Sequence, residues 1–183
     1  DAILNQFISY MRDGSDEEPQ DTDINMLLQE LVIQFKPLDI RFTAQELPII
    51  QARSLSLKRL IGNLINNAKR YGAEPIEISA QVENNQLLIS VADHGEGIPA
   101  DQIEDLMQPF VRGNDARTIQ GSGLGLAIVK RIVDIHNGQI LIQNREQGGL
   151  EAIISLPLSK TEVDEVLNNS ALEKIKQTLS ERF

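Results

Sequence analysis

From about residue 22 to residue 158, short stretches with strand-like patterns alternate with longer stretches in which apolar residues recur at helical spacing. The pattern predicts helices over 25–35, 54–71 and 124–136, with a short one after Pro99. It predicts strands over 39–43, 48–52, 76–82, 87–93, 139–144 and 149–156. Neighbouring strands look like antiparallel partners. We therefore expect an α+β fold, a two-layer α/β sandwich with helices on one face of a mixed sheet.

The two ends of the chain differ from this central region. Residues 1–13 have the pattern of the end of an amphipathic helix, and the polar, acidic stretch 14–21 is typical of a linker. Residues 22–158 are then the main domain, and 159–183 form an amphipathic helical tail that docks on this domain or on a neighbouring chain. Because the chain lacks an initiator Met and opens in helical pattern, we expect it to be a fragment of a longer protein.

Charge and composition exclude several classes of function. The chain has 17 basic and 27 acidic residues, a net charge of −10, so it offers no electrostatic surface for nucleic acid or anionic lipid. The absence of cysteine excludes disulfides, thiol catalysis and cysteine metal sites, and two histidines are too few for a histidine-rich centre. No apolar run approaches the ~18 residues of a membrane span, so the chain is not expected to insert in a membrane.

The helix expected over 54–71 carries two stripes. Ser54 is placed as its N-cap and Gly72 as its C-terminal stop. One stripe is apolar and should face the sheet, and beside it lie Asn63, Asn67 and Arg70. A polar stripe at the margin of a core can line a cleft, where Asn offers an oxygen ligand to Mg²⁺ and Arg a charge to phosphate. Taken alone, the stripe could also be no more than a solvated flank of the helix.

An acidic residue ends the most regular strand pattern. In the strand 87–93, the period of two puts Asp93 on the same face as Leu87, Ile89 and Val91. A carboxylate at the edge of a core needs a polar partner. The segment continues as D-x-G-x-G-I, whose glycines permit close backbone approach. Asp93 could accept a hydrogen bond from the amino group of a flat ligand such as adenine, or simply end the strand before a glycine turn.

A second glycine-rich segment opens the helix expected over 124–136. Gly121, Gly123 and Gly125 precede it, and such a turn presents free N–H groups to anions. It is not a P-loop, because no G-K-[ST] follows, and no strand precedes it as a Rossmann motif requires. The stretch 111–123 has no periodicity and is expected to be a long loop in which Arg112 and Arg117 cover a nucleotide.

These elements form an ordered set: an N-x-x-x-N helix, D-x-G-x-G-I, QPFVRG and G-x-G-L-G-L. In this order they resemble the catalytic ATP-binding domain of sensor histidine kinases, within the gyrase/Hsp90/histidine kinase/MutL ATPase superfamily. The sequence is similar to the osmosensor kinases of the EnvZ type in the segments QPFVRG…DARTI…GSGLGLAIVKRIVDIHNG…GGL, and the similarity covers residues 1–158. The resemblance implies the Bergerat form of the sandwich.

The resemblance also implies roles for particular residues. Asn67 would coordinate the Mg²⁺ that bridges the ATP phosphates, with Asn63 supporting it, while Arg70 contacts phosphate and Tyr71 packs near the base and ribose. Asp93 would accept the adenine amino group, in a pocket shaped by Gly95, Gly97 and Ile98. The lid over the phosphates would contain Arg112, Gly113, Arg117, Gly121, Ser122, Gly123, Leu124, Gly125 and Leu126.

Three classes of function remain to be compared. A kinase of this type phosphorylates a histidine on a dimeric two-helix hairpin, and residues 1–13 resemble the end of that hairpin, but neither His94 nor His136 has the acceptor context. Hydrolytic members of the superfamily use a Glu, four residues before the Mg²⁺ ligand, as general base; Asn63 occupies that position here and cannot take the proton. The chain could also be a nucleotide-gated binding module.

The resemblance therefore predicts a protein histidine kinase domain that binds ATP and Mg²⁺. Its expected partners are its own acceptor hairpin, the second protomer of a homodimer and a cognate response regulator. The domain itself would be cytoplasmic, in a parent protein of the bacterial inner membrane.

Overall fold

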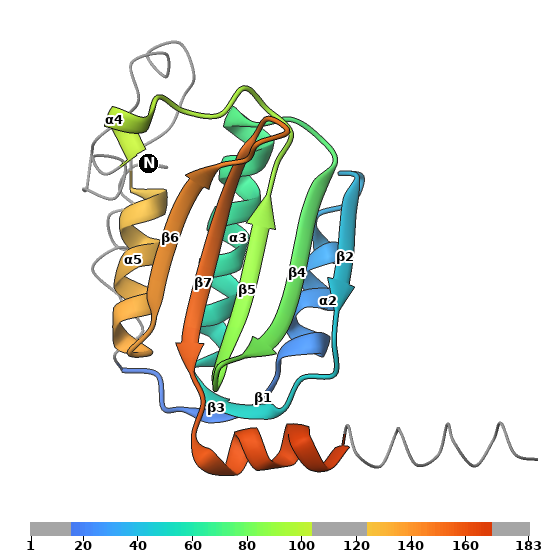
Figure 1. Cartoon of the computed structure of the whole chain (residues 1–183), viewed down its shortest axis with the longest axis vertical. Helices are drawn as coiled ribbons and strands as arrows, with labels where there is room; N and C mark the ends of the chain where they lie inside the picture. The colour runs from blue at the N-terminus through green and yellow to red at the C-terminus, as the bar shows by residue number, and fades with distance from the viewer. Residues whose placement is uncertain (1–15, 104–123, 170–183) are drawn as a thin grey trace, which may run out of the picture.

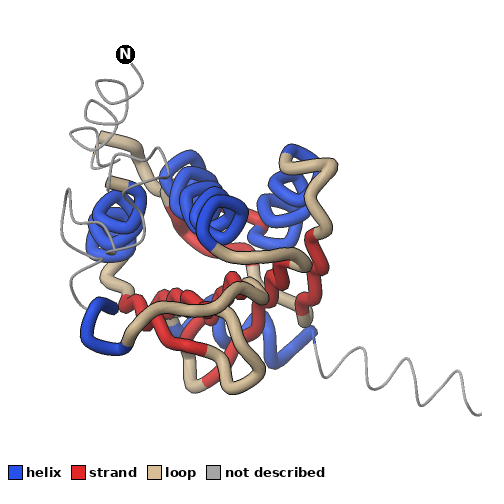
Figure 2. Tube along the Cα trace, turned by 90° about the horizontal axis from the view of Figure 1, so that it is seen from above, coloured by secondary structure: helices blue, strands red, loops and turns tan. Residues whose placement is uncertain are grey.

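The computed structural model describes residues 16–103 and 124–169, which fold as two layers (Figure 1). One layer is a five-stranded sheet with the order β2-β4-β5-β7-β6. Its strands are β2 (Ile40–Ala44), β4 (Ile76–Glu83), β5 (Gln86–Ala92), β6 (Gln139–Asn144) and β7 (Leu150–Pro157). The helices of the other layer are α2 (Ile24–Gln34), α3 (Ser54–Tyr71) and α5 (Gly125–Ile135). Figure 2 shows these three helices on one side of the strands, which confirms the predicted sandwich.

The sheet is mixed, as predicted. β4 and β5 form an antiparallel hairpin through Asn84 and Asn85, whose positive φ values of 51° and 61° suit a tight turn that asparagine tolerates. β2, however, pairs with β4 in parallel. The expectation of antiparallel neighbours is therefore wrong for β2, whose successor β3 (Ile49–Ala52) lies in a separate two-stranded sheet with β1 (Gln20–Asp23).

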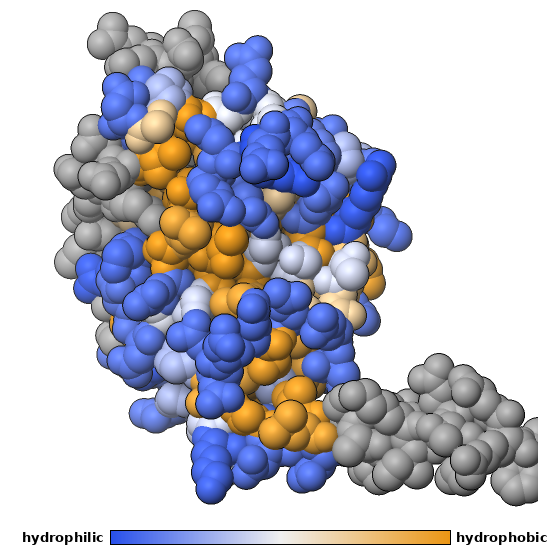
Figure 3. Space-filling model, in the orientation of Figure 1, coloured by the Kyte–Doolittle hydropathy of each residue, from blue (hydrophilic) through white to orange (hydrophobic). Residues whose placement is uncertain are grey.

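The core lies between the helices and the inner face of the sheet. The apolar stripe predicted on α3 is buried at Leu57, Leu60, Ile61, Leu64, Ile65 and Ala68. Burying a side chain of the size of Leu or Ile contributes roughly 1.5–3 kcal/mol. The other face of the sheet is not covered by described helices, and Figure 3, which looks onto it, shows apolar side chains among hydrophilic ones. Leu141 of β6 is exposed and is the cross-strand neighbour of Ile153 of β7.

The segment before α2 is attached to the domain more firmly than the sequence predicts. Residues Gln20 and Asp21, within the predicted linker 14–21, pair with Ala52 and Gln51 as part of β1. Glu17 lies further upstream in the same segment. Its carboxylate accepts hydrogen bonds from the Leu55 N–H at 2.8 Å, the Ser56 N–H at 2.9 Å and the Ser56 hydroxyl at 2.7 Å.

This contact corrects the predicted start of α3. The N-cap residue is Arg53, which makes no side-chain capping hydrogen bond, and Ser54 is the first residue of the helix. Two of the free N–H groups of the first turn, those of Leu55 and Ser56, are satisfied by Glu17 from a distant part of the chain. The predicted stop at Gly72 is confirmed.

His136 joins the end of α5 to the start of α3. Its Nδ1 donates to the Ile132 carbonyl at 2.8 Å, and its Nε2 accepts from the Arg53 N–H at 3.2 Å, which requires a neutral ring. Burial lowers the pKa of His136 below its ordinary value and outweighs the Ile132 hydrogen bond, which raises it. The charge of Arg53 lowers this pKa further, and that of Glu17 raises it.

This arrangement predicts a loss of stability in mild acid. The unfolded chain binds the proton near the ordinary histidine pKa and the folded chain only at lower pH, so the free energy of unfolding falls as pH drops below about 6.5. We expect urea denaturation between pH 7.5 and 5.5 to show this fall, and His136→Gln, which keeps an acceptor for Arg53, to reduce it. An identical pH dependence in the two proteins would contradict the assignment.

The tail begins as a helix over 160–169, whose first turn contacts the small sheet. The Glu162 carboxylate accepts from the Gln51 N–H at 2.9 Å and from the Ser159 N–H at 2.6 Å. Figure 1 shows this helix beneath the β1–β3 end of the domain. Within the described ranges, no helix combines the length and apolar character that a membrane crossing requires.

Candidate functional site

Three elements meet at the end of the sheet opposite the tail helix. They are the C-terminal half of α3, the loop that follows β5, and the start of α5 (Figure 1). Gly125 lies directly against Asn67: a Cβ added at Gly125 would be 3.3 Å from the Asn67 Oδ1. The structure therefore brings the N-x-x-x-N helix and the last glycine of the G-x-G-L-G segment into contact.

The polar stripe of α3 lies at the margin of its buried face. Asn63 and Asn67 are half-buried, and the Asn63 Nδ2 donates to the Arg59 carbonyl at 2.9 Å. Arg70 and Tyr71, in the last turn, are exposed, Tyr71 by 47%. The Asn67 amide is thus available at the α3–α5 contact, while the Arg70 charge and the Tyr71 ring reach solvent.

Asp93 is buried at the end of β5, with an exposed fraction of 6%. Its Oδ1 accepts from the Gly95 N–H at 2.8 Å and the Leu150 N–H at 3.3 Å. Within the part of the chain that the structure describes, its Oδ2 receives no hydrogen bond, so an acceptor remains for a ligand. The packing is close: a Cβ at Gly72 would be 2.3 Å from the Asp93 Cγ.

The rest of the D-x-G-x-G-I loop is held by β6. Gly97 has a φ of +79°, and a Cβ there would be 2.5 Å from the Asn144 Oδ1. The Ile98 N–H donates to that same oxygen at 2.9 Å, and the Asn144 Nδ2 donates to the Ile98 carbonyl at 2.7 Å. Glycine is therefore required at position 97 by both backbone conformation and space.

The predicted lid falls mostly outside the described residues. Arg112, Gly113, Arg117, Gly121, Ser122 and Gly123 all lie there. Of the described members, Leu124 is buried, and Gly125 and Leu126 are half-buried at the start of α5.

The described residues would offer a divalent cation an amide oxygen rather than a cluster of carboxylates. Among the described residues, no three His, Cys, Asp or Glu side chains gather as a metal site. A divalent cation here would rely on an amide oxygen, phosphate oxygens and water, which is the set Mg²⁺ prefers beside a nucleotide. Asn67, kept clear by the missing side chain of Gly125, offers that amide oxygen.

Sequence reasoning missed the residues of β4 and of the end of β6 that support the loop 93–98. Glu77 and Asn144 fall within predicted strands and Arg145 between two of them, yet all three contact the loop or its supports. The hydrogen-bonding capacity of Asn and Arg was the only available signal, because their partners are far away in sequence.

Comparison with known proteins agrees with this arrangement. The model of histidine kinase-, DNA gyrase B- and HSP90-like ATPases matches residues 52–160, which is more than half of the chain. The chain belongs to this ATPase family. The matched region contains α3, the Asp93 loop and α5.

Relatives of this ATPase family member include named sensor kinases. The sensor histidine kinase GtrS of Pseudomonas aeruginosa is 32% identical over 142 residues, 77% of this chain and 29% of that protein. The sensor protein KdpD of Escherichia coli is 37% identical over 115 residues, 62% of this chain and 13% of that protein. The chain thus spans less than a third of the length of either relative.

Solved structures of the ATPase family share the fold. The histidine kinase domain of the E. coli osmosensor EnvZ is 40% identical, with a TM-score of 0.61, over 79% of this chain and 92% of that one. Full-length ShkA in complex with AMPPNP aligns with a TM-score of 0.76 at 24% identity, over 86% of this chain and 35% of that one. The predicted resemblance to the EnvZ type is confirmed.

Proposed function

We propose that this chain is the ATP-binding catalytic domain of a two-component sensor histidine kinase. On this proposal it transfers the γ-phosphoryl group of ATP to a histidine on a dimerisation hairpin, for relay to a response regulator. The observation that carries the proposal is the buried Asp93 carboxylate, at the same end of the sheet as the Asn67–Gly125 contact. One of its oxygens is hydrogen-bonded, and the other receives no hydrogen bond from the described residues.

Each described residue of the site has a role in this proposal. The open Oδ2 of Asp93 accepts the adenine amino group, and Gly95, Gly97 and Ile98 form the wall of the adenine pocket. Asn67, supported by Asn63, ligates Mg²⁺, which neutralises phosphate charge when bound. Arg70 contacts phosphate and Tyr71 packs near the ribose. The remaining lid residues, from Arg112 to Leu126, close over the phosphates.

The identity of residue 63 favours phosphoryl transfer over hydrolysis. A water nucleophile needs a general base, and the Asn63 amide cannot accept a proton near neutral pH. In this structure the Asn63 Nδ2 is already bonded to the Arg59 carbonyl, one turn back in α3. Transfer then depends on a nucleophile positioned in line by another segment.

The proposal includes a larger parent protein. Residues 1–13 would end the acceptor hairpin helix, 14–21 would connect it, 22–158 would bind ATP and 159–183 would form the tail. The hairpin would form a homodimer, and the parent would lie in the bacterial inner membrane with this chain on the cytoplasmic side. The Glu17 contact to the first turn of α3 supports a defined attachment of the segment 14–21 to the ATP-binding domain.

Incubation with ATP labelled at the γ-phosphate tests this function. Residues 1–183 should release phosphate very slowly and acquire no acid-labile label, because neither His94 nor His136 has the acceptor context. The matching hairpin, added as a separate chain, should become labelled weakly, since the tether that raises its effective concentration is missing.

The control and the contrary outcomes are distinct. A hairpin whose acceptor histidine is replaced by glutamine should stay unlabelled. Acid-labile label on the isolated chain would indicate a self-modifying domain. Fast phosphate release that Asn63→Ala leaves unaltered would indicate a free-standing ATPase.

A further inference from the structure

We propose that Asn144 and Arg145 are positioning residues that hold the two ends of the loop 93–98 and thereby set the preference of the site for adenine. The proposal rests on the proposed function, in which Asp93 recognises the base. Both residues come from the end of β6, at the turn into β7, and neither belongs to the motifs that point to ATP.

Asn144 fixes the far end of the loop. Its Oδ1 accepts from the Ile98 N–H at 2.9 Å and its Nδ2 donates to the Ile98 carbonyl at 2.7 Å. The side-chain amide thus pairs with the main chain as a neighbouring strand would, with donor and acceptor both used. Gly97 has no Cβ, which leaves room for this amide.

Arg145 fixes the near end of the loop. Its Nη1 donates to the Asp93 carbonyl at 2.9 Å and lies 3.1 Å from the His94 Nε2. The Arg145 main chain independently closes the β6–β7 turn through hydrogen bonds with Gly148 and Gly149. A substitution of the side chain alone therefore leaves the turn its own hydrogen bonds.

The guanidinium of Arg145 is itself held in place. Its Nη2 donates to the Glu77 Oε2 at 2.9 Å, and the other Glu77 oxygen lies 3.0 Å from the His94 Nε2. The hydrogen bond with His94 does most to lower the pKa of the Glu77 carboxyl, and the charge of Arg145 lowers it further. The planar fork of arginine can reach the Asp93 carbonyl and Glu77 together, whereas lysine offers a single ammonium group.

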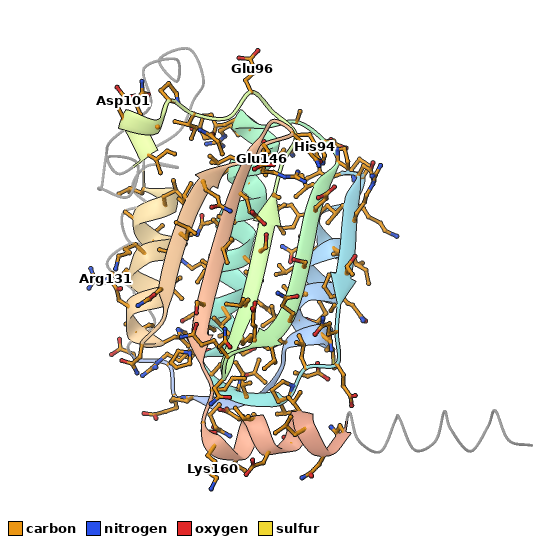
Figure 4. All side chains as sticks on the ribbon, in the orientation of Figure 1. His94, Glu96, Asp101, Arg131, Glu146 and Lys160 are labelled. Carbon is orange, nitrogen blue, oxygen red and sulfur yellow. The ribbon has the colours of Figure 1, made fainter. Side chains whose placement is uncertain are left out.

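The cluster supports the loop from the face of the sheet opposite the helices. Glu77 pairs in register with Arg41 of β2 on one side and with Ala92 of β5 on the other. It lies on the face where Arg41, Ser90 and Glu151 line a shallow hollow. Figure 4 shows His94 and Glu146 at the same end of the sheet, and Glu96 pointing away from the strands. Arg145 therefore acts through Asp93 rather than by touching a nucleotide bound on the helix side.

The two anchors affect the position of the Asp93 Oδ2. The Asp93 Oδ1 is occupied by two N–H groups, so the direction of Oδ2 is set by the local main chain. The Asp93 N–H donates to the Leu150 carbonyl at 2.9 Å, and the Asp93 carbonyl accepts from Arg145. Arg145 thereby fixes the peptide bond between Asp93 and His94. Loss of either anchor should let the loop shift and weaken the hydrogen bond to the amino group of the base.

The experiment compares ATP with purine riboside triphosphate, which lacks only the exocyclic amino group. Calorimetric titration with Mg²⁺ present gives the ratio of the two dissociation constants. The unmodified chain should prefer ATP by about tenfold or more, and Asp93→Asn should bring the ratio near one. Asn144→Ala and Arg145→Gln should each lower the ratio at least about threefold, and Arg145→Lys should fall between.

Two controls separate positioning from general stability. Glu146→Ala changes the same turn at an exposed residue for which the described residues show no hydrogen bond to the loop, and Arg41→Gln removes an arginine from the same sheet face. Both variants should keep the unmodified ratio. General destabilisation weakens both nucleotides alike and leaves the ratio unchanged, and thermal denaturation identifies any variant that does not fold. If Arg145→Gln is not folded, Asn144→Ala and Arg145→Lys still decide the result.

The outcomes distinguish this inference from the function on which it rests. A reduced ratio in the Asn144 and Arg145 variants, with the controls unchanged, supports it. A clear preference for ATP that Asp93→Asn abolishes, but that Asn144→Ala and Arg145→Gln leave intact, overturns the positioning role alone. Equal affinity of the unmodified chain for both nucleotides overturns the role of Asp93 and this inference with it.

Discussion

Replacing Asn67 with alanine is expected to weaken Mg²⁺-dependent ATP binding by about 100-fold or more while leaving the domain folded. The Asn67 amide is half-buried at the contact between α3 and α5, 3.3 Å from the position that a Gly125 Cβ would take. Its removal takes away the oxygen that we assign to the metal, and with it a bridge to the phosphates. No buried apolar group is lost, so the melting temperature should change little.

Calorimetric titrations of ATP, with Mg²⁺ and with a chelator, measure this effect. The matched control is Asn66→Ala, because Asn66 neighbours Asn67 on α3 but is exposed on the outer side of the helix. Asn66→Ala should bind Mg²⁺·ATP like the unmodified chain, and the chelator should abolish the difference between the two variants. Unchanged affinity of Asn67→Ala with Mg²⁺ present would remove Asn67 from the metal site.

The elements of the fold were predictable where the signal is local. The β4–β5 hairpin follows from two alternating stretches around Asn84 and Asn85, and α3 follows from an apolar stripe of 3.6-residue period that ends at Gly72. These patterns depend on neighbours within a few residues. Their positions in the structure agree with the prediction to within about a residue at most boundaries.

Pairings between distant segments were not predictable in the same way. β2 and β3 are consecutive in sequence, but β2 joins the main sheet parallel to β4 while β3 pairs with β1. The side chain that accepts hydrogen bonds at the start of α3 belongs to Glu17, 38 residues before Leu55, so no local pattern indicates it, and Ser54 is the first helical residue rather than the N-cap. The sequence shows that a polar side chain needs a hydrogen-bond partner, but only the fold shows which residue that partner is.

The same limit applies to the site. Asp93 and the glycines after it stand out because an acid at the end of an apolar strand has a cost. Arg145 and Glu77 do not stand out, since each looks like an ordinary exposed charge until the sheet brings them together. The residues that support a site from behind are therefore found by structure rather than by sequence.

Replacing Gly149 with alanine is expected to have the largest effect on folding. A Cβ there would be 1.9 Å from the Asp93 carbonyl oxygen and 2.7 Å from its carbon, which are backbone atoms that cannot move aside. Gly149 also has a φ of +94°, which L-residues rarely adopt. The combined clash and strain should cost about 2–5 kcal/mol of unfolding free energy, measured by urea denaturation, and ATP binding should fall because Asp93 is displaced.

Gly148→Ala is the matched control for this prediction. Gly148 has a nearly identical φ of +89°, but among the described residues a Cβ there would meet only the Gly95 carbonyl oxygen, at 3.6 Å. Both variants carry the backbone strain, and only Gly149→Ala carries the clash with Asp93. Gly148→Ala should therefore lose about 1–2 kcal/mol and retain nucleotide affinity. Equal losses of stability in the two variants would mean that backbone conformation, rather than contact with the Asp93 carbonyl, requires glycine at position 149.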